Sequence, residues 1–65
     1  MSTVLKVTIS KSSEFCYIVL SCSDNRFEQQ FGPFIQVHLL DSYEKMHEVT
    51  EWARSLGAEA IFSVV

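Results

Sequence analysis

The chain has 65 residues, of which 48% are hydrophobic and 20% charged, and its formal net charge is −3 at pH 7. These values are typical of one globular domain spanning 1–65 and exclude a disordered chain. Only five lysine and arginine residues are present, so direct nucleic-acid binding, which depends on neutralising phosphates, is not expected. No apolar run reaches the roughly 20 residues of a membrane span, and the N-terminus lacks a signal-peptide pattern. We therefore expect a cytoplasmic protein that does not contact membranes.

The N-terminal third of the chain predicts two strands. Leu5, Val7 and Ile9 alternate with polar residues, which indicates a strand over 4–10 with one buried side. Aromatic and β-branched residues predict a second strand over about 15–22.

The segment 26–40 is open to two interpretations. Phe27 and Phe31 fit an alternating strand pattern, and the alternation resumes after Gly32-Pro33. Because proline donates no ladder hydrogen bond, it is confined to sheet edges and interruptions. We expect either one long, kinked edge strand or a strand followed by a separate short one.

The C-terminal half predicts a helix and a last strand. Asp41 and Glu44 have the spacing of a capping box, with Ser42 as an alternative cap. Gly57 suits the left-handed position after the last helical turn, and a strand follows over 59–65. The apolar stripe of the helix is formed by Met46, Val49, Ala53 and Leu56, with Tyr43 and Trp52 beside it.

The predicted order is β-β-β-α-β, an α+β fold in which one helix packs on one face of a small antiparallel or mixed sheet. The opposite face then has no second layer. A strand with one solvated side should alternate apolar and polar residues, but the second and last strands carry apolar groups on both sides. This mismatch predicts an uncovered apolar face that binds a partner.

The two cysteines are expected to be free, buried and structural. Cys16 and Cys22 are six residues apart on one predicted strand, roughly 20 Å, whereas a disulfide needs Cα atoms within about 7 Å. Free cysteines fit a reducing compartment.

The segment Ser21-Cys22-Ser23-Asp24-Asn25-Arg26 resembles the Cys-Ser-Asp-Ser-Arg segment of β-class carbonic anhydrases, in which the cysteine ligates zinc and the Asp-Arg pair gates the site. That family also requires a downstream His-x-x-Cys pair. No cysteine follows Cys22, and neither His38 nor His47 has that context. The resemblance therefore does not predict a zinc enzyme.

No other pattern predicts catalysis. Neither histidine has a nucleophile and an acid in a supporting pattern, and the chain's two glycines form no phosphate-binding loop. We expect a protein that is not an enzyme and that holds no cofactor or metal.

One flank of the predicted helix is acidic. Glu44, Glu48 and Glu51 lie side by side at spacings of four and three, either as a surface for a basic partner or as a solvated helix face. Trp52 is either an interface anchor or part of the core.

The sequence thus predicts a small non-enzymatic protein-binding module. Its predicted element order, and the Glu51-Trp52 pair in the helix, resemble the small phage inhibitors of bacterial RNA polymerase, which implies an inhibitor or regulator of a larger host protein. The net charge of −3 is compatible with a partner that has a basic surface. The alternative is a homodimeric structural or small-ligand-binding domain that uses the uncovered sheet face. The expected partner-binding residues are Phe15, Tyr17, Val19, Phe34, Glu44, Glu48, Glu51 and Trp52.

Overall fold

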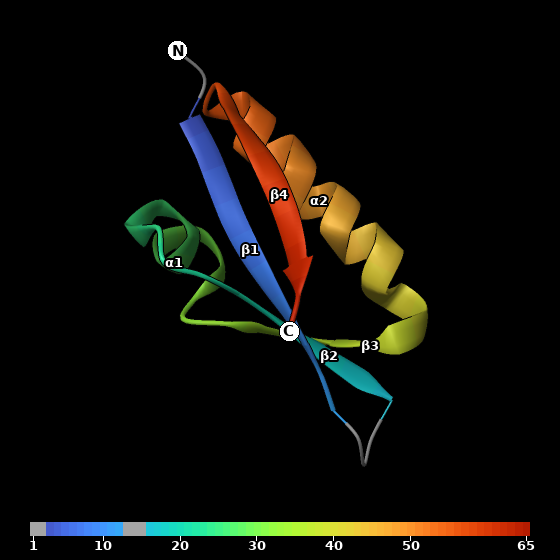
Figure 1. Cartoon of the computed structure of the whole chain (residues 1–65). Helices are drawn as coiled ribbons and strands as arrows, with labels where there is room; N and C mark the ends of the chain where they lie inside the picture. Colours follow the sequence, from blue (N-terminus) through green and yellow to red (C-terminus); the bar gives the residue numbers. More distant parts are fainter. Residues whose placement is uncertain (1–2, 13–15) are drawn as a thin grey trace.

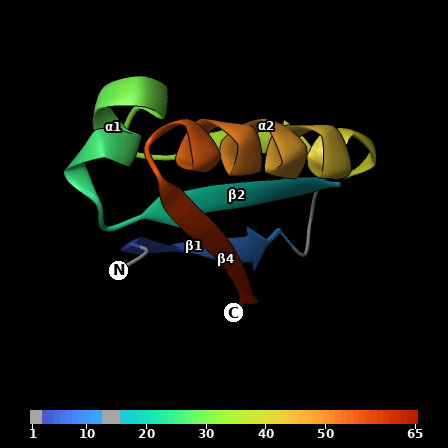
Figure 2. The same cartoon turned by 90° about the horizontal axis from the view of Figure 1, so that it is seen from above.

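A computed structural model describes residues 3–12 and 16–65 of the chain. Within these residues a four-stranded mixed sheet has the strand order β3-β2-β1-β4, and both α-helices lie on one of its faces (Figures 1 and 2). The α+β class is therefore confirmed. In chain order the elements are β1 (Thr3–Lys11), β2 (Tyr17–Cys22), α1 (Asn25–Phe31), β3 (Ile35–His38), the 3-10 turn η1 (Leu39–Asp41), α2 (Ser42–Ser55) and β4 (Ala58–Val64).

The sheet is built on a central hairpin. β1 pairs antiparallel with β2, so that Ser10 lies opposite Val19. β4 pairs with β1 in parallel, and β3 pairs with β2 antiparallel. β3 and β4 are therefore the two edge strands, and both run parallel to β1. The strands predicted over 4–10 and 59–65 are confirmed, and so is the part of the second strand from Tyr17 onward.

The prediction of a strand over the segment that starts at Arg26 is wrong, because this segment forms α1. Asp24 is the N-cap of α1, and its carboxylate accepts a hydrogen bond from the backbone N–H of Arg26 at 2.8 Å. Gly32 ends the helix at φ 89°, a conformation that favours glycine. Phe27 and Phe31 are four residues apart, a spacing that puts them on one face of either a strand or a helix. The separate short strand after Pro33 is confirmed as β3.

The helix over the C-terminal half is confirmed as α2, but its predicted capping box is wrong. Asp41 lies in η1 and makes no side-chain capping hydrogen bond, and Ser42 is already the first residue of α2. The backbone N–H of Ser42 donates to the carbonyl of Leu39. Because the 3-10 turn leads directly into the helix, its backbone satisfies the first N–H of α2 without a side-chain cap. Gly57 has the predicted positive φ, 72°.

The core lies between the helices and the sheet. Val49 and Ala53 of α2 are fully buried, as the predicted stripe requires, and Met46 is partly buried, whereas Leu56 lies after the last turn and is exposed. α1 contributes Phe27, which packs edge-on against Trp52 at a ring distance of 5.9 Å. The strand residues of the core are Leu5, Val7, Ile9, Ile18, Leu20, Val37 and Ala58.

Both cysteines are free. Cys22 is partly buried on the helix side of β2, where it packs against the core. Cys16 is exposed, just before β2, so the prediction that it is buried is wrong. The reason is that β2 begins at Tyr17, two residues later than predicted, which leaves Cys16 outside the strand.

A matched pair of phenylalanines tests this core. Phe27 is 0% exposed and Phe34 is 55% exposed. Phe27→Ala should lower the free energy of unfolding by about 3–5 kcal/mol, a large part of the stability of so small a domain. Phe34→Ala should change it by less than about 0.5 kcal/mol. Urea denaturation followed by circular dichroism measures both, and equal losses would contradict the placement of Phe27 in the core.

Candidate functional site

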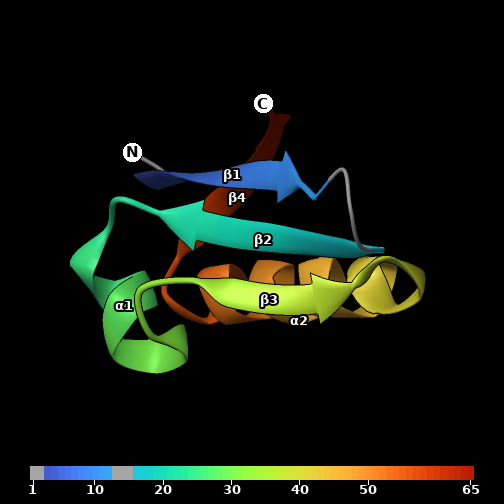
Figure 3. The ribbon, with the colours of Figure 1, turned by 90° about the horizontal axis from the view of Figure 1, so that it is seen from below.

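The sheet face opposite the helices has no second layer within the described residues. Figure 3 shows α1 and α2 on one side of β2 and β1, below them in this view, with β3 in front of α2. Tyr17 of β2 is 39% exposed on this face, directly opposite His38 of β3. The two rings meet edge to face at 5.5 Å and 82°. Val19 and Gln36 form the next cross-strand pair on the same face. We call these four residues the Tyr17 patch.

Hydrogen bonds from backbone N–H groups position Tyr17 and His38 in the Tyr17 patch. The carbonyl of Tyr17 accepts a hydrogen bond from the N–H of Ser12 at 3.0 Å, which extends the β1–β2 ladder. His38 Nδ1 accepts a hydrogen bond from the N–H of Leu40 at 3.2 Å. The imidazole that contacts Tyr17 is thereby oriented by the start of η1.

The rest of the open face is more polar than the sequence predicted. β4 places Glu59, Ile61 and Ser63 on this face, whereas its other apolar residues face the helices. The sequence predicted apolar side chains on both sides of the last strand. Of the apolar residues of β4, only Ile61 lies on the open face, and it is 44% exposed. Val4 of β1 is also exposed on the open face. It lies two residues before Lys6, which is the β1 residue opposite Ile61.

The other predicted aromatic site residues do not join the Tyr17 patch. Phe15 lies outside the described residues. Phe34 is exposed in the segment that leads into β3. Trp52 packs with Phe31 at a ring distance of 5.2 Å and with Phe27, so its ring belongs to the core that joins α1 to α2.

The predicted acidic flank of α2 is exposed, but two of its three carboxylates pair with cations of the same helix. Glu48 contacts Lys45 at 2.8 Å, and Glu51 contacts Arg54 at 3.3 Å. Within residues 3–12 and 16–65, Glu44 has no ion-pair partner of this kind. The flank is therefore a charge-balanced, solvated helix face rather than a concentrated negative surface.

Asp24 and Arg26, the acid and base of the segment that resembles carbonic anhydrases, form an ion pair at the start of α1. Both carboxylate oxygens of Asp24 accept hydrogen bonds from the Arg26 guanidinium, each at 3.0 Å. The side-chain hydrogen bond from Arg26, followed by the backbone bond from the same residue, lowers the pKa of Asp24. Across the described residues no group of three histidine, cysteine or acidic side chains is placed to hold a metal ion.

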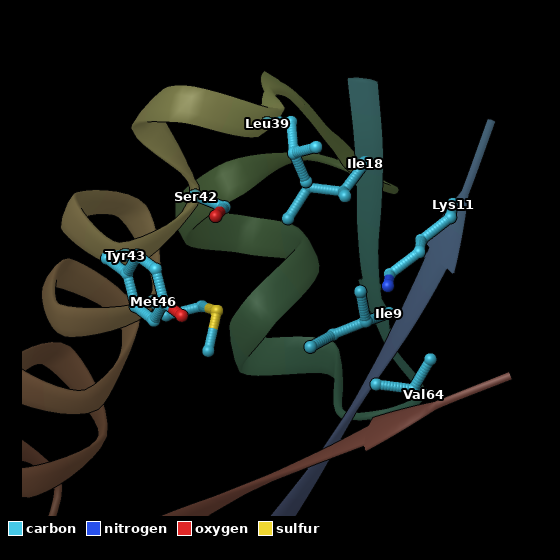
Figure 4. A pocket seen from close by; sticks show the side chains of 8 residues that line it. All are labelled: Ile9, Lys11, Ile18, Leu39, Ser42, Tyr43, Met46 and Val64. Atoms are coloured by element: carbon cyan, nitrogen blue, oxygen red, sulfur yellow. The ribbon is translucent and has the colours of Figure 1, made fainter. Parts of the chain in front are cut away.

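A hollow of about 300 Å³ lies on the helix side, between the start of α2 and the ends of β1 and β4 (Figure 4). Two of its polar groups have no partner within the described part of the chain. Ser42 is 8% exposed and its hydroxyl lines the hollow, and the Lys11 side chain runs toward it from the strand. Sequence reasoning missed both residues, because the hollow that they line depends on how α2 packs against the end of β1. The apolar lining comes from Ile9, Ile18, Leu39, Met46 and Val64.

No protein-family model, curated protein or solved structure matches this chain significantly. None of the helices in the described ranges is long and apolar enough to cross a bilayer.

The lowered pKa of Asp24 predicts a specific acid sensitivity. The fold favours the charged carboxylate, so its stabilisation is complete above the ordinary pKa of 3.8 and is lost as the pH falls through the lowered value. Asp24→Asn keeps an oxygen that can cap α1 but removes the charge, so unfolding should depend less on pH below about 4. Urea titrations at a series of acidic pH values measure this. Asp41→Asn is the control, because its carboxylate makes no capping hydrogen bond, and an identical effect there would contradict the assignment.

Proposed function

We propose that this protein is a non-enzymatic binding module whose open sheet face, centred on the Tyr17 patch, docks on a larger protein. The observation that supports this most directly is the one-sided layering of the fold, which leaves Tyr17 half-exposed on a rigid sheet although the core is small. Partly exposed tyrosines in preorganised surroundings are enriched among residues that dominate binding energy.

The geometry of the patch supports this role further. The ring of Tyr17 stands against His38, and both come from paired strands rather than from loops. A fixed side chain loses little conformational freedom when a partner covers it, so more of the contact energy remains for binding. Val19 beside Tyr17 adds apolar contact area, and Gln36 adds hydrogen-bond donors and acceptors for the polar rim of an interface.

The acidic helix flank is the weaker candidate surface, since Glu48 and Glu51 already pair within α2. A basic partner is consistent with the net charge of −3, although the charge is not concentrated on that flank. The presence of α1 changes the element order on which the resemblance to phage inhibitors of RNA polymerase was based. Regulation or inhibition of a larger host protein therefore stays a proposal that depends on the exposed Tyr17 patch.

Two substitutions separate the two surfaces. Affinity capture from cells that encode the protein, quantified by mass spectrometry, should recover a specific partner with the native chain. Tyr17→Asp puts a charge in the centre of the patch and should reduce capture by about tenfold or more. Glu48→Lys should leave capture unchanged. Both variants should keep the native circular dichroism spectrum, since both positions are solvent-exposed. The reverse pattern would place the interface on α2 and contradict the proposal.

The hollow at the start of α2 supports a second candidate function, the binding of a small amphipathic carboxylate. Its volume is at the lower limit of small-molecule sites. An apolar tail would contact Ile9 and Met46, and the carboxylate would pair with the Lys11 ammonium, while Ser42 lines the hollow from the α2 side. Neither the Ser42 hydroxyl nor the Lys11 ammonium has a side-chain partner within the described residues, so both are free to bind polar groups of a ligand.

Octanoate and octanol distinguish this site from general apolar binding. Octanoate should shift the amide resonances of residues around Ser42 and should bind more tightly than octanol. Lys11→Gln should weaken octanoate binding by about tenfold, with little effect on octanol, and Lys11→Arg should retain it. Equal affinity for the two probes, or no binding of either, would rule this function out.

A further inference from the structure

The two edges of the sheet differ in how well they are protected against pairing with another strand. β3 is four residues long and directly follows a segment that contains Pro33. β4 is seven residues long, contains no proline and carries one charge, Glu59. Soluble proteins normally shorten, charge or cover an edge strand, because its unpaired backbone groups are a template for another strand. β4 has little of this protection, and its exposed side chains include Ile61 and Val64.

The hydrogen bonding of β4 to β1 shows which of its backbone groups are unpaired. The N–H of Val65 donates to the carbonyl of Ile9 at 2.9 Å, and Ile9 lies opposite Val64. In a parallel pair the backbone groups of alternate residues point to the same neighbour. The odd-numbered residues of β4 therefore bond to β1, and the N–H and C=O groups of the even-numbered residues Ala58, Ala60, Phe62 and Val64 point away from the sheet.

We propose that these groups pair with the same groups of a second copy of this chain, so that two β4 strands run antiparallel across a twofold axis at Ile61. This register pairs the whole length of both strands. Ala60 then forms hydrogen bonds with Phe62 of the second copy, and Ala58 with Val64. The pairing joins two four-stranded sheets into one continuous sheet and removes both β4 edges.

The side chains of β4 are self-complementary in this register. On the open face the two Ile61 side chains are direct neighbours, and each Glu59 lies opposite an uncharged Ser63. No like charges meet, which removes the usual obstacle to pairing identical strands. On the helix side, the small Ala60 lies opposite the large Phe62. A hollow of about 340 Å³ lined by Thr50, Arg54 and Ala60 adjoins this position and leaves space for the facing ring.

These observations favour a second copy of this chain as the partner of the β4 edge. In one register the unpaired backbone groups form hydrogen bonds, Glu59 avoids a like charge, and Ile61 packs against its copy. A chain of 65 residues also gains from association, since its own core is small. The inference does not depend on the Tyr17 patch, which lies on β2 and β3, so either proposal can fail without the other.

Opposite charges at one exposed position test the register. In the antiparallel pair Ser63→Glu places a second carboxylate beside Glu59 of the other copy, and Ser63→Lys places an ammonium there. With two such contacts in each dimer, Ser63→Glu should raise the dimer dissociation constant by about two- to thirtyfold, and Ser63→Lys should lower it by a similar factor. Sedimentation velocity over a wide range of concentrations measures both against the native chain.

Ala60→Pro tests the backbone itself. It removes an N–H that points away from β1, so the monomer should keep its circular dichroism spectrum while the dimer is lost. Tyr17→Asp should leave the dimer unchanged. A native chain that stays monomeric at the highest concentrations would overturn the inference. A dimer that responds equally to Ser63→Glu and Ser63→Lys would also overturn it, because the two strands could not then have this register.

Discussion

The crossover from β3 through α2 to β4 determines most of this structure. It joins two strands that are parallel to each other but lie at opposite edges of the sheet. The chain must therefore cross over both β2 and β1, a distance of about 14 Å between the edges. α2 has 14 residues, about 21 Å of helix, enough to cross the sheet diagonally. It contacts β3 near its start and β4 near its end, and it buries Val49 and Ala53 between them.

This crossover also explains why one face and one edge stay open. A helix that crosses the sheet on one side cannot shield the other side, and α1 packs on the same side through Phe27 and Trp52. The strand that follows the crossover is added last, outside β1, so nothing later in the described chain pairs with its outer edge. The uncovered face and the unpaired edge of β4 are thus two consequences of a single connection.

The sequence predicted the elements whose pattern was long enough to be decisive. Strand β1 alternates over its whole length, and α2 has a stripe that only a helical period explains. α1 was not predicted, because its seven residues are too few to distinguish the two-residue period of a strand from the 3.6-residue period of a helix. The information was nevertheless present in the chain: Asp24 is a favoured N-cap, and Gly32 followed by Pro33 is a typical helix stop. The same residue types also form turns, so these signals alone do not distinguish a short helix from a turn.

The candidate surface was predicted less well than the fold, and the reason is register. Which side of a strand faces the helices cannot be read from its own residues when both sides carry apolar groups. Pairing with β1 places Ala60 and Phe62 on the helix side and Glu59 and Ser63 on the open face, so most of the expected uncovered apolar surface is absent. Tyr17 lies exposed on the open face. Its pairing with His38, and the hollow that both Ser42 and Lys11 line, depend on contacts between distant segments that spacing along the chain does not reveal.

The two proposed surfaces have a geometric relation that follows from the fold. A twofold axis through Ile61 that joins two β4 strands in one sheet must run perpendicular to that sheet, because the strands are antiparallel and in plane. The helices of both copies then lie on one side and both open faces on the other. Since β2 and β3 are the strands farthest from β4, the two Tyr17 patches would lie toward opposite ends of this common face. Such a dimer would present two equivalent sites in a fixed orientation, and a partner with matching repeats would bind both more tightly than one, because the second contact becomes intramolecular.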